Sequence, residues 1–442
     1  MRYEPFFYQK KALDYILNRD VSMLMFGGGM GSTSVALTVA IELLYERFRA
    51  DKILIVTSRA AVFGKWECEM EKWDHLSCLK AGFIRGSDME RKRVLSAGFG
   101  LYFITHESFE WLDSVDGFPF SNIIIDDFHL YSNPGTKRFK HLIKIRQKLK
   151  FILALSSLSF INHIEDLWGQ LFILDGGKRL ESGKGGFYDR YYFSKRYKTE
   201  TGSRVIRELK EGSLEHIRER IKDICFIEAP SLIMASKARR YCIRAVEMNE
   251  VEYSKYKIID KGILSLSEMD ERIEKESYTI KKMQAANGMI YDSEENVHVI
   301  HTRKVEELKS ILKSTPGERV LVAHYFRHER EVITRHVPYL DSIEGYNDIN
   351  KWNHGEKKAA LISVGAFNRF SAGIIETDIL IWFSLPWSFA LYEKVNSSVL
   401  KKTGAVIYHL IMRNTIDEEL MQNIEVNRKR CLVLGGLNDQ RR

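Results

Sequence analysis

The stretch SMLMFGGGMGSTSVAL, residues 22–37, joins a short apolar run to a second apolar segment through four glycines. The run SMLMF has the length and composition of a buried strand, and the residues from Ser34 onward continue as a helix. A glycine loop between a strand and a helix is the setting in which backbone N–H groups can surround a phosphate. The stretch therefore predicts an α/β domain, with a purely structural role of the glycines as the alternative reading.

The same region raises the question of a membrane span, because Val21 to Ile41 contains no charged residue. Four glycines and five serine or threonine residues interrupt this segment. They favour the strand, loop and helix over a transmembrane helix. The N-terminus has no secretory apolar region, so we expect a cytoplasmic protein, or one in the host cytoplasm if its source is viral.

Apolar runs and amphipathic segments alternate along most of the chain. Continuous apolar strands separated by helices indicate parallel sheets that are covered on both faces. This pattern occupies residues 1–175 and recurs from residue 291 to 442. Residues 176–290 are more charged and have the pattern of a mostly helical insert. We therefore expect an α/β protein with two parallel-sheet lobes and a basic insert between them.

Composition sets wide limits on the function. The chain has 442 residues, of which 45% are hydrophobic and 29% charged, and its formal net charge is +8. A chain of this length and apolar content can bury a core without disulfides or metals, and it is not disordered. The five cysteines are scattered and form no CxxC pair, which argues against a zinc ribbon or a disulfide frame.

A second chemical signal is NIIIDDFHL, residues 122–130, an apolar strand that ends in Asp126 and Asp127. Carboxylates at the carboxyl end of a strand in an α/β sheet are suited to hold a metal ion or to act as a general base. An Asp-rich turn is the structural alternative. Together with the glycine loop, the aspartate pair indicates a domain of the NTPase type.

At this point the sequence resembles the helicase-like ATPases of superfamily 2, in particular the short SNF2-like type common in phage genomes. The similarity follows the order of the family's motifs along nearly the whole chain. Four segments carry most of it: FFYQKKALDYIL (6–17), ILIVTSRAAVFGKWECEMEKW (53–73), IIIDDFH (123–129) and LIWFSLPWSFALYEKVN (380–396). The resemblance implies two RecA-like lobes, a nucleotide site that takes ATP with Mg²⁺, and DNA as the partner.

The same resemblance gives individual residues their expected roles. Gln9 stands where the family reads adenine, and Asp126 stands where it holds Mg²⁺. If the protein is active, Asp126 and Asp127 are the expected catalytic carboxylates. The expected nucleotide-binding residues are Gln9, Gly29, Gly31, Ser32 and Thr33.

Several positions depart from the family pattern. Ser32 replaces the lysine of the G-K-T motif, and Asp127 replaces the general-base glutamate. Ser398 and Lys401 stand where two arginines belong, and no arginine lies between Trp382 and Ile411. An arginine finger alone contributes about 10³–10⁵ in the rate of phosphoryl transfer. The degenerate motifs therefore predict a pseudo-helicase that does not hydrolyse ATP, with weak binding of ATP and Mg²⁺ left open.

The predicted insert concentrates positive charge. Residues 178–210 hold ten basic and four acidic side chains, a net charge of +6, with six aromatic side chains interspersed. Lysine and arginine neutralise phosphates, and aromatic rings stack on bases, so this stretch is a candidate nucleic-acid site. The alternative is that the aromatic rings form the core of the insert. The expected nucleic-acid contacts are Lys178, Arg179, Lys184, Arg190, Lys195, Arg196 and Lys198.

Three functions remain open on the sequence alone. The first is a non-hydrolysing, helicase-like protein that binds nucleic acid, double-stranded DNA in particular, in replication, recombination or phage–host conflict. The second is a divergent but active ATP-dependent DNA translocase. The third is a scaffold or decoy for a protein partner, such as an active helicase or a replication or defence factor. None of the three requires a membrane.

Overall fold

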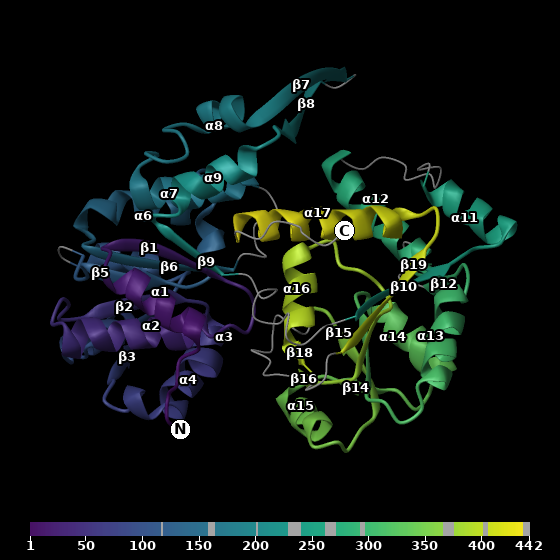
Figure 1. Ribbon diagram of the computed structural model, residues 1–442, viewed down its shortest axis with the longest axis horizontal. Coiled ribbons are helices and arrows are strands. Elements are labelled where there is room, and N and C mark those ends of the chain that lie inside the picture. The colour runs from purple at the N-terminus through teal and green to yellow at the C-terminus, as the bar shows by residue number, and fades with distance from the viewer. Residues whose placement is uncertain are drawn as a thin grey trace. The chain divides into compact units, whose positions relative to one another are not determined.

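The computed structural model describes nine ranges of the chain (Figure 1). They are residues 1–115, 118–157, 164–199, 202–228, 240–260, 271–291, 297–365, 375–400 and 405–435. The chain divides into two compact units. Unit 1 comprises Met1–Leu232 and Asn427–Arg442, and unit 2 comprises Ile233–Val426.

Unit 1 is built on a seven-stranded parallel sheet with the strand order β3-β4-β2-β5-β6-β1-β9. Its strands are β1 (Val21–Phe26), β2 (Ile53–Thr57), β3 (Ala81–Phe83), β4 (Leu101–Thr105), β5 (Asn122–Ile125), β6 (Phe151–Ser157) and β9 (Cys225–Glu228). Its helices are α1 (Phe7–Leu17), α2 (Ser32–Ile41), α3 (Arg59–Ala61), α4 (Glu67–Lys72), α5 (Asp88–Ser96), α6 (Lys137–Ile145), α7 (Ile164–Asp175), α8 (Lys184–Tyr191) and α9 (Ser213–Ile221). A hairpin of β7 (Tyr192–Thr199) and β8 (Gly202–Leu209) follows α8.

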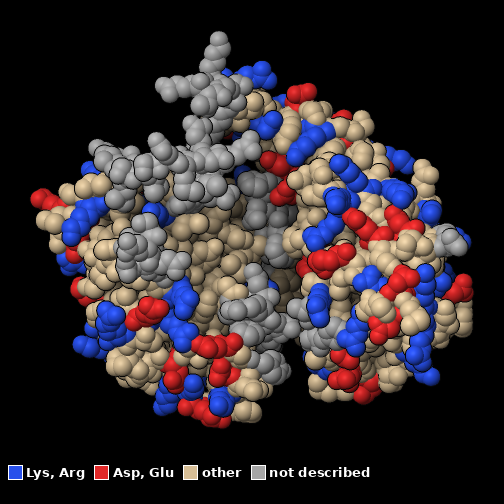
Figure 2. All heavy atoms as spheres, turned by 180° about the vertical axis from the view of Figure 1, so that it is seen from behind, with Lys and Arg blue, Asp and Glu red and all other residues tan. Residues whose placement is uncertain are grey.

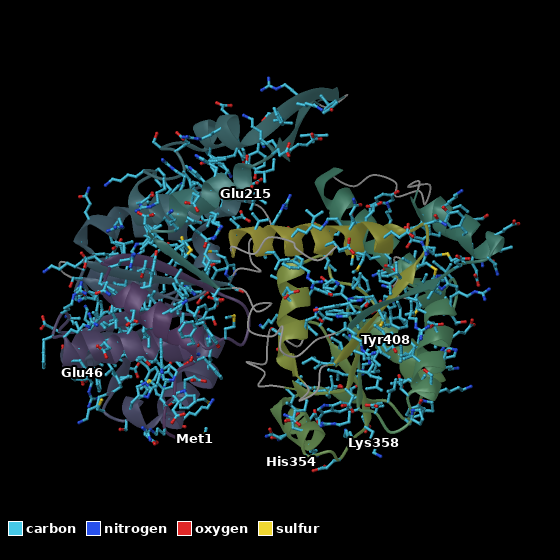
Figure 3. The ribbon with its side chains drawn as sticks, viewed as in Figure 1. Met1, Glu46, Glu215, His354, Lys358 and Tyr408 are labelled. Atoms are coloured by element: carbon cyan, nitrogen blue, oxygen red, sulfur yellow. The ribbon has the colours of Figure 1, made fainter. Side chains whose placement is uncertain are left out.

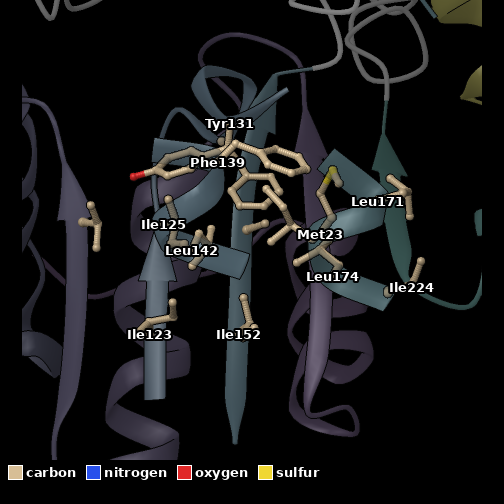
Figure 4. Close-up of a cluster of buried hydrophobic side chains, with 14 of the residues drawn as sticks. Met23, Ile123, Ile125, Tyr131, Phe139, Leu142, Ile152, Leu171, Leu174 and Ile224 are labelled. Atoms are coloured by element: carbon tan, nitrogen blue, oxygen red, sulfur yellow. The ribbon is translucent and has the colours of Figure 1, made fainter. Parts of the chain in front are cut away.

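The sheet of unit 1 forms because its central strands are apolar on both faces. Ile152 in β6 is paired with Val21 in β1 and with Ile123 in β5, and Ile152 and Ile123 are fully buried. Figure 4 shows these strands beneath Leu142 of α6 and Leu171 of α7. Burial of each such side chain contributes about 1.5–3 kcal/mol. The residues between Val21 and Ile41 thus form a strand, a glycine loop and a helix, as predicted.

Unit 2 has a six-stranded parallel sheet with the order β10-β19-β17-β13-β15-β14. Its strands are β10 (Arg240–Val246), β13 (Val320–His324), β14 (Asp341–Ile343), β15 (Ala359–Ser363), β17 (Ile379–Trp382) and β19 (Val406–Met412). Two small pairs are β11 (Met289–Tyr291) with β12 (Val297–Val299) and β16 (Ile375–Glu376) with β18 (Val399–Leu400). Its helices are α11 (Glu250–Asp260), α12 (Glu271–Ala286), α13 (Arg303–Ser314), α14 (Arg327–His336), α15 (Tyr346–Asn353) and α16 (Phe389–Ser398), and α17 (Ile416–Leu434) begins in this unit and ends in unit 1.

The α/β class with two parallel sheets, expected from the sequence, is confirmed. The predicted insert does not form a unit of its own. Its residues 176–228 lie in unit 1, and its residues 240–290 lie in unit 2. The segment predicted as a mostly helical insert also contains strands: β9 is an edge strand of the first sheet, and β10 is an edge strand of the second. Neither strand has a long apolar run, because β9 has only four residues and most side chains of β10 are exposed. Among the described residues, no helix is long and apolar enough to cross a membrane.

Candidate functional site

The glycine loop lies at the carboxyl edge of the first sheet, between β1 and α2. Gly31 has a φ of 80°, a left-handed conformation that favours glycine, and it caps the N-terminus of α2. Gly29 also has a positive φ of 76° and is exposed. Of the two hydroxyl residues that follow, Ser32 is partly exposed and Thr33 is buried. The loop thus joins the strand to the helix through two glycines in the left-handed conformation and carries no ammonium group of its own.

Gln9, the expected adenine-reading residue, lies against this loop. Its Nε2 donates a hydrogen bond to the carbonyl oxygen of Met30 at 3.0 Å. Its Oε1 accepts the backbone N–H of Phe6 at 2.9 Å, and the side chain is buried. Gln9 and the glycine loop are therefore brought together as expected from the sequence, and the amide of Gln9 is engaged with the protein's own backbone.

Asp126 lies at the same edge, one residue beyond β5. Its backbone N–H bonds to Val56 of the adjacent strand β2, which brings Thr57 beside its carboxylate. Oδ2 of Asp126 accepts hydrogen bonds from Thr57 Oγ1 at 3.0 Å and Trp66 Nε1 at 3.2 Å. The ammonium Nζ of Lys65 also donates to this oxygen, at a distance of 3.4 Å. Oδ1 accepts the backbone N–H of Asp127 at 3.1 Å, so donors contact both oxygens.

The charge of Asp126 is stabilised although the side chain is buried. Burial raises the pKa of this carboxyl, but the ammonium of Lys65 and the hydrogen bonds from Thr57, Asp127 and Trp66 outweigh it and lower the pKa. Burial likewise disfavours the charged form of Lys65, yet the two aspartates raise its pKa. Both groups are therefore charged at neutral pH and form a matched ion pair.

Lys65 belongs to this site although its place there was not predicted from the sequence. It lies in a single π-helical turn, Val62–Trp66, between α3 and α4. Its neighbour Trp66 is fully buried and hydrogen-bonded to the same carboxylate, so the turn fixes both side chains on Asp126. The sequence shows only that a lysine directly precedes the first tryptophan of the segment 53–73. Sequence spacing does not reveal that this lysine, in the connection after one strand, contacts a carboxylate in the connection after another.

Asp127, the second expected catalytic carboxylate, occupies a special backbone position. Its φ of 46° puts a non-glycine residue in the left-handed region, where it begins the 3₁₀ turn Phe128–Tyr131. The side chain is partly exposed. Near Asp126, burial lowers the pKa of His106 and of His129 to about 4, so both rings are neutral at pH 7.

The donor set around Asp126 does not fit a bound Mg²⁺. Mg²⁺ requires oxygen ligands in octahedral geometry and keeps several waters. Here Oδ2 of Asp126 already contacts an ammonium, an indole N–H and a hydroxyl. Among the described residues there is also no group of three or more His, Cys, Asp or Glu side chains that could hold a metal ion. The metal role expected for Asp126 stays a prediction without structural support.

The expected nucleic-acid residues separate into two groups. Arg179 is held by Asp175 at 3.1 Å and by Asp223 at 2.6 Å, and the exposed Arg190 forms an ion pair with Glu181. Arg179 thus links the end of α7 to the residues after α9, and Arg190 links α8 to the loop before it. Their own carboxylate partners offset their charge, which weakens the case for phosphate contacts at both positions.

The other group is more accessible. Lys178 is exposed before α8, and Lys184 lies 5.7 Å from the ring centre of Tyr188. Lys195 and Arg196 are exposed on β7. Lys198 belongs to the same strand, but its side chain lies outside the described ones. Figure 1 shows the β7–β8 hairpin extending beyond α8.

The aromatic residues of this region divide into a buried group and an exposed group. Phe187, Tyr191 and Tyr192 are buried and belong to the core of unit 1. Phe193 and Tyr197 on β7 are 58% and 48% exposed, and Ile206 on β8 is 41% exposed. Core packing therefore explains the aromatic residues of α8 and Tyr192 at the start of β7, but not Phe193 and Tyr197. Figure 3 shows the side chains of this region above α9, on which Glu215 is labelled.

The hairpin presents mixed side chains on both faces. Because side chains alternate along a strand, Phe193, Lys195 and Tyr197 share one face, and Ile206 lies opposite Lys195. Arg196 lies on the other face together with Arg207, whose guanidinium is 3.8 Å from the ring centre of Tyr188. Elsewhere basic and acidic side chains are interspersed over the surface, as Figure 2 shows for one side of the molecule.

The chain is similar to a phage protein and to a solved structure. No model of a protein family matches the chain. The chain is 26% identical to protein p41 of Acyrthosiphon pisum secondary endosymbiont phage 1, over 94% of each chain. It is also similar to a solved structure, the Sulfolobus solfataricus SWI2/SNF2 ATPase core in complex with dsDNA, with a TM-score of 0.46 and 15% identity. That similarity covers 99% of this chain and 94% of the other.

Proposed function

We propose that this protein is a helicase-like protein that binds double-stranded DNA and does not hydrolyse ATP. The observation that carries the DNA-binding part is the β7–β8 hairpin, a two-stranded ribbon with exposed basic and aromatic side chains on a unit of the α/β class. A two-stranded ribbon has a width that the major groove of DNA admits.

The chemistry of the hairpin supports this partner. Lys195 and Arg196 lie next to each other on β7 and so point to opposite faces of the ribbon. The phosphates line both walls of the groove, and the long side chains of Lys195 and Arg196 can extend from the ribbon toward them. The exposed rings of Phe193 and Tyr197 would contact sugars or base edges. An isolated hairpin is marginally stable in water, so a partner that covers it would also stabilise it.

The lack of hydrolysis is supported by the nucleotide-type edge of unit 1. Ser32 places a neutral hydroxyl where phosphoryl transfer requires a cation, and Asp127 is one methylene shorter than the usual general base. The carboxylate of Asp126 is paired with Lys65. Each change removes part of the electrostatic stabilisation of a transferring phosphate. A divergent, active translocase is the competing proposal, and a protein scaffold is the third.

DNA binding is tested by removing the two hairpin charges. In the Lys195→Gln/Arg196→Gln variant we expect the affinity for a 30-bp duplex to fall about tenfold, and the slope of log K against log[salt] to decrease by about 2. Fluorescence anisotropy at several salt concentrations measures both. The matched control is Lys140→Gln/Lys148→Gln, two exposed lysines of the same unit, which should leave affinity and slope close to the wild-type values.

The outcomes separate the three functions. Wild-type affinity and slope in the hairpin variant would overturn the role of the hairpin. No binding of any duplex at low salt would favour the protein scaffold. Steady ATP turnover that duplex DNA stimulates and Asp127→Asn abolishes would establish the active translocase instead.

A further inference from the structure

We infer that Lys65 is the resident cation of Asp126 and that its ammonium takes the place beside this carboxylate that Mg²⁺ would need. The inference gives the non-hydrolysing half of the proposed function a physical cause, and it does not depend on the DNA-binding half. It concerns only residues of unit 1, in two connections of the first sheet: the one after β2, which includes the turn that holds Lys65, and the one after β5.

Oδ2 of Asp126 is saturated with donors. A carboxylate oxygen offers about two lone-pair directions, and this oxygen accepts from three donors. Two of these donors are fixed, because Thr57 and Trp66 are buried and Trp66 Nε1 also contacts Thr57 Oγ1 at 3.2 Å. A metal ion that approached Oδ2 would have to displace the third donor, the ammonium of Lys65.

The charge of the site is already balanced. Asp126 is 5% exposed, so its negative charge requires a nearby positive charge. The ammonium of Lys65 supplies it, and the same ammonium also experiences the field of Asp127. A divalent ion added to this arrangement would face an ammonium in direct contact with its ligand. Like charges at such a distance repel strongly where water is largely excluded.

Lys65 is also held in place by the turn around it. Ser58 caps the N-terminus of α3 by accepting the N–H of Ala61 at 3.3 Å, and the π-helical turn follows directly. Trp66 is fully buried and packs edge-on against Phe103, with ring centres 5.7 Å apart. The adjacent residue is therefore positioned by a buried anchor. The Lys65 side chain is 34% exposed, so its stem lies along the protein and its head reaches the carboxylate.

A metal titration tests the inference without reference to catalysis. Mn²⁺ is the probe, and its binding is followed by the loss of the free-ion signal in electron paramagnetic resonance. We expect the wild type to bind no Mn²⁺ at Asp126 in the submillimolar range. Lys65→Met should bind Mn²⁺ at least tenfold more tightly than the wild type. Lys65→Met/Asp126→Asn should lose that gain.

Two further variants control for charge and folding. Lys65→Arg keeps a cation at the position and should bind as little Mn²⁺ as the wild type. Lys72→Met removes the neighbouring cation of α4, which lies over Trp73 and contacts Glu69 instead, and should also show no gain. Thermal unfolding of each variant checks that it is folded, and Lys65→Gln replaces Lys65→Met if the latter is not.

Either of two results would overturn the inference. Submillimolar Mn²⁺ binding by the wild type that Asp126→Asn abolishes would contradict it, and so would the absence of any gain in a folded Lys65→Met or Lys65→Gln variant. The result is distinct from the test of the proposed function. A protein that bound no metal but hydrolysed ATP would refute the proposed function and leave the inference standing.

Discussion

At the scale of single residues, Gly31 shows how the loop sequence and the rest of unit 1 depend on each other. Its φ of 80° is reached at little cost only by glycine, and a Cβ at this position would collide with Nε2 of Gln9. The residue is therefore constrained twice, once by its own backbone and once by the packing of α1 against the loop.

Gly31→Ala should destabilise the protein by clearly more than the backbone term alone. Gly212 provides the matched control, since it also caps a helix N-terminus with a φ of 73° but has no atom within 4 Å of an added Cβ. We expect Gly212→Ala to cost about 1 kcal/mol and Gly31→Ala about 2 kcal/mol or more in the free energy of unfolding. Urea unfolding measures both.

The difference between the two variants should come from Gln9. Adding Gln9→Ala to Gly31→Ala removes the colliding amide and should recover part of the extra loss, whereas Gln9→Ala added to Gly212→Ala should be additive. Equal losses for the two glycine variants would show that the contact with Gln9 does not constrain the loop.

The sequence indicates which segments meet at this sheet edge but not all of their contacts. The glycine loop and Asp126 each follow an apolar strand, a pattern that is legible in a sequence, and Gln9 of α1 was expected there from the family resemblance. Their roles in nucleotide and metal binding stay predictions. The pairing of Lys65 with Asp126 was not predicted. It depends on a π-helical turn and a buried tryptophan, and neither leaves a periodic signal.

At the scale of elements, the strands in the middle of each sheet were predictable and the edge strands were not. The run NIII of β5 and the run ILIVT of β2 are buried throughout. In contrast, β10 has mostly exposed side chains, two of them arginines, and β9 has only four residues. A short or polar edge strand is specified by its partner in the sheet, so its own sequence carries little of the information.

The start of α14 contains a buried carboxyl that should make stability depend on pH. Glu329 accepts the N–H groups of Tyr325 and Phe326 and the hydroxyl of Ser384. Burial raises its pKa to about 7, although these hydrogen bonds and the charge of Lys304 lower it. Between about pH 4.5 and 7 the folded state thus keeps a proton that the unfolded state has released, so stability falls as the pH rises through this window.

Glu329→Gln should remove that dependence. The amide cannot ionise, so the variant should be more stable than the wild type at pH 8, by about 2–3 kcal/mol at most, and close to it at pH 4.5. Chemical unfolding followed by circular dichroism at the two pH values measures the change. Glu331→Gln, an exposed glutamate on the same helix, is the control. A constant difference between variant and wild type at both pH values would contradict the assignment.

At the scale of the whole molecule, α17 joins the two units in sequence. It begins at Ile416, which is buried in unit 2, and ends at Leu434, which is buried in the core of unit 1. The sequence pattern places all of this segment in the second lobe, since a continuous helical pattern gives no indication of a change of partner along its length.

Leu434→Ala should therefore destabilise unit 1, although the residue lies more than two hundred positions after Met1–Leu232, the segment that forms most of that unit. We expect a loss of about 2–3 kcal/mol in the free energy of unfolding. Val426 on the same helix is 39% exposed, and Val426→Ala should cost less than about 0.5 kcal/mol. Hydrogen exchange read by mass spectrometry should show faster exchange in β1 and β6 for the first variant only. Faster exchange confined to unit 2 would refute this role of Leu434.

The course of α17 has a consequence for the order of synthesis. A ribosome releases the strands of unit 1 first, yet the final turns of α17, which supply Leu434 and the packed side chain of Cys431, emerge only after unit 2. Unit 1 thus begins to fold before unit 2 is made but is completed after it. An incomplete nascent chain would carry an uncovered apolar surface on unit 1 throughout the translation of unit 2, and during that interval the chain depends most on chaperones.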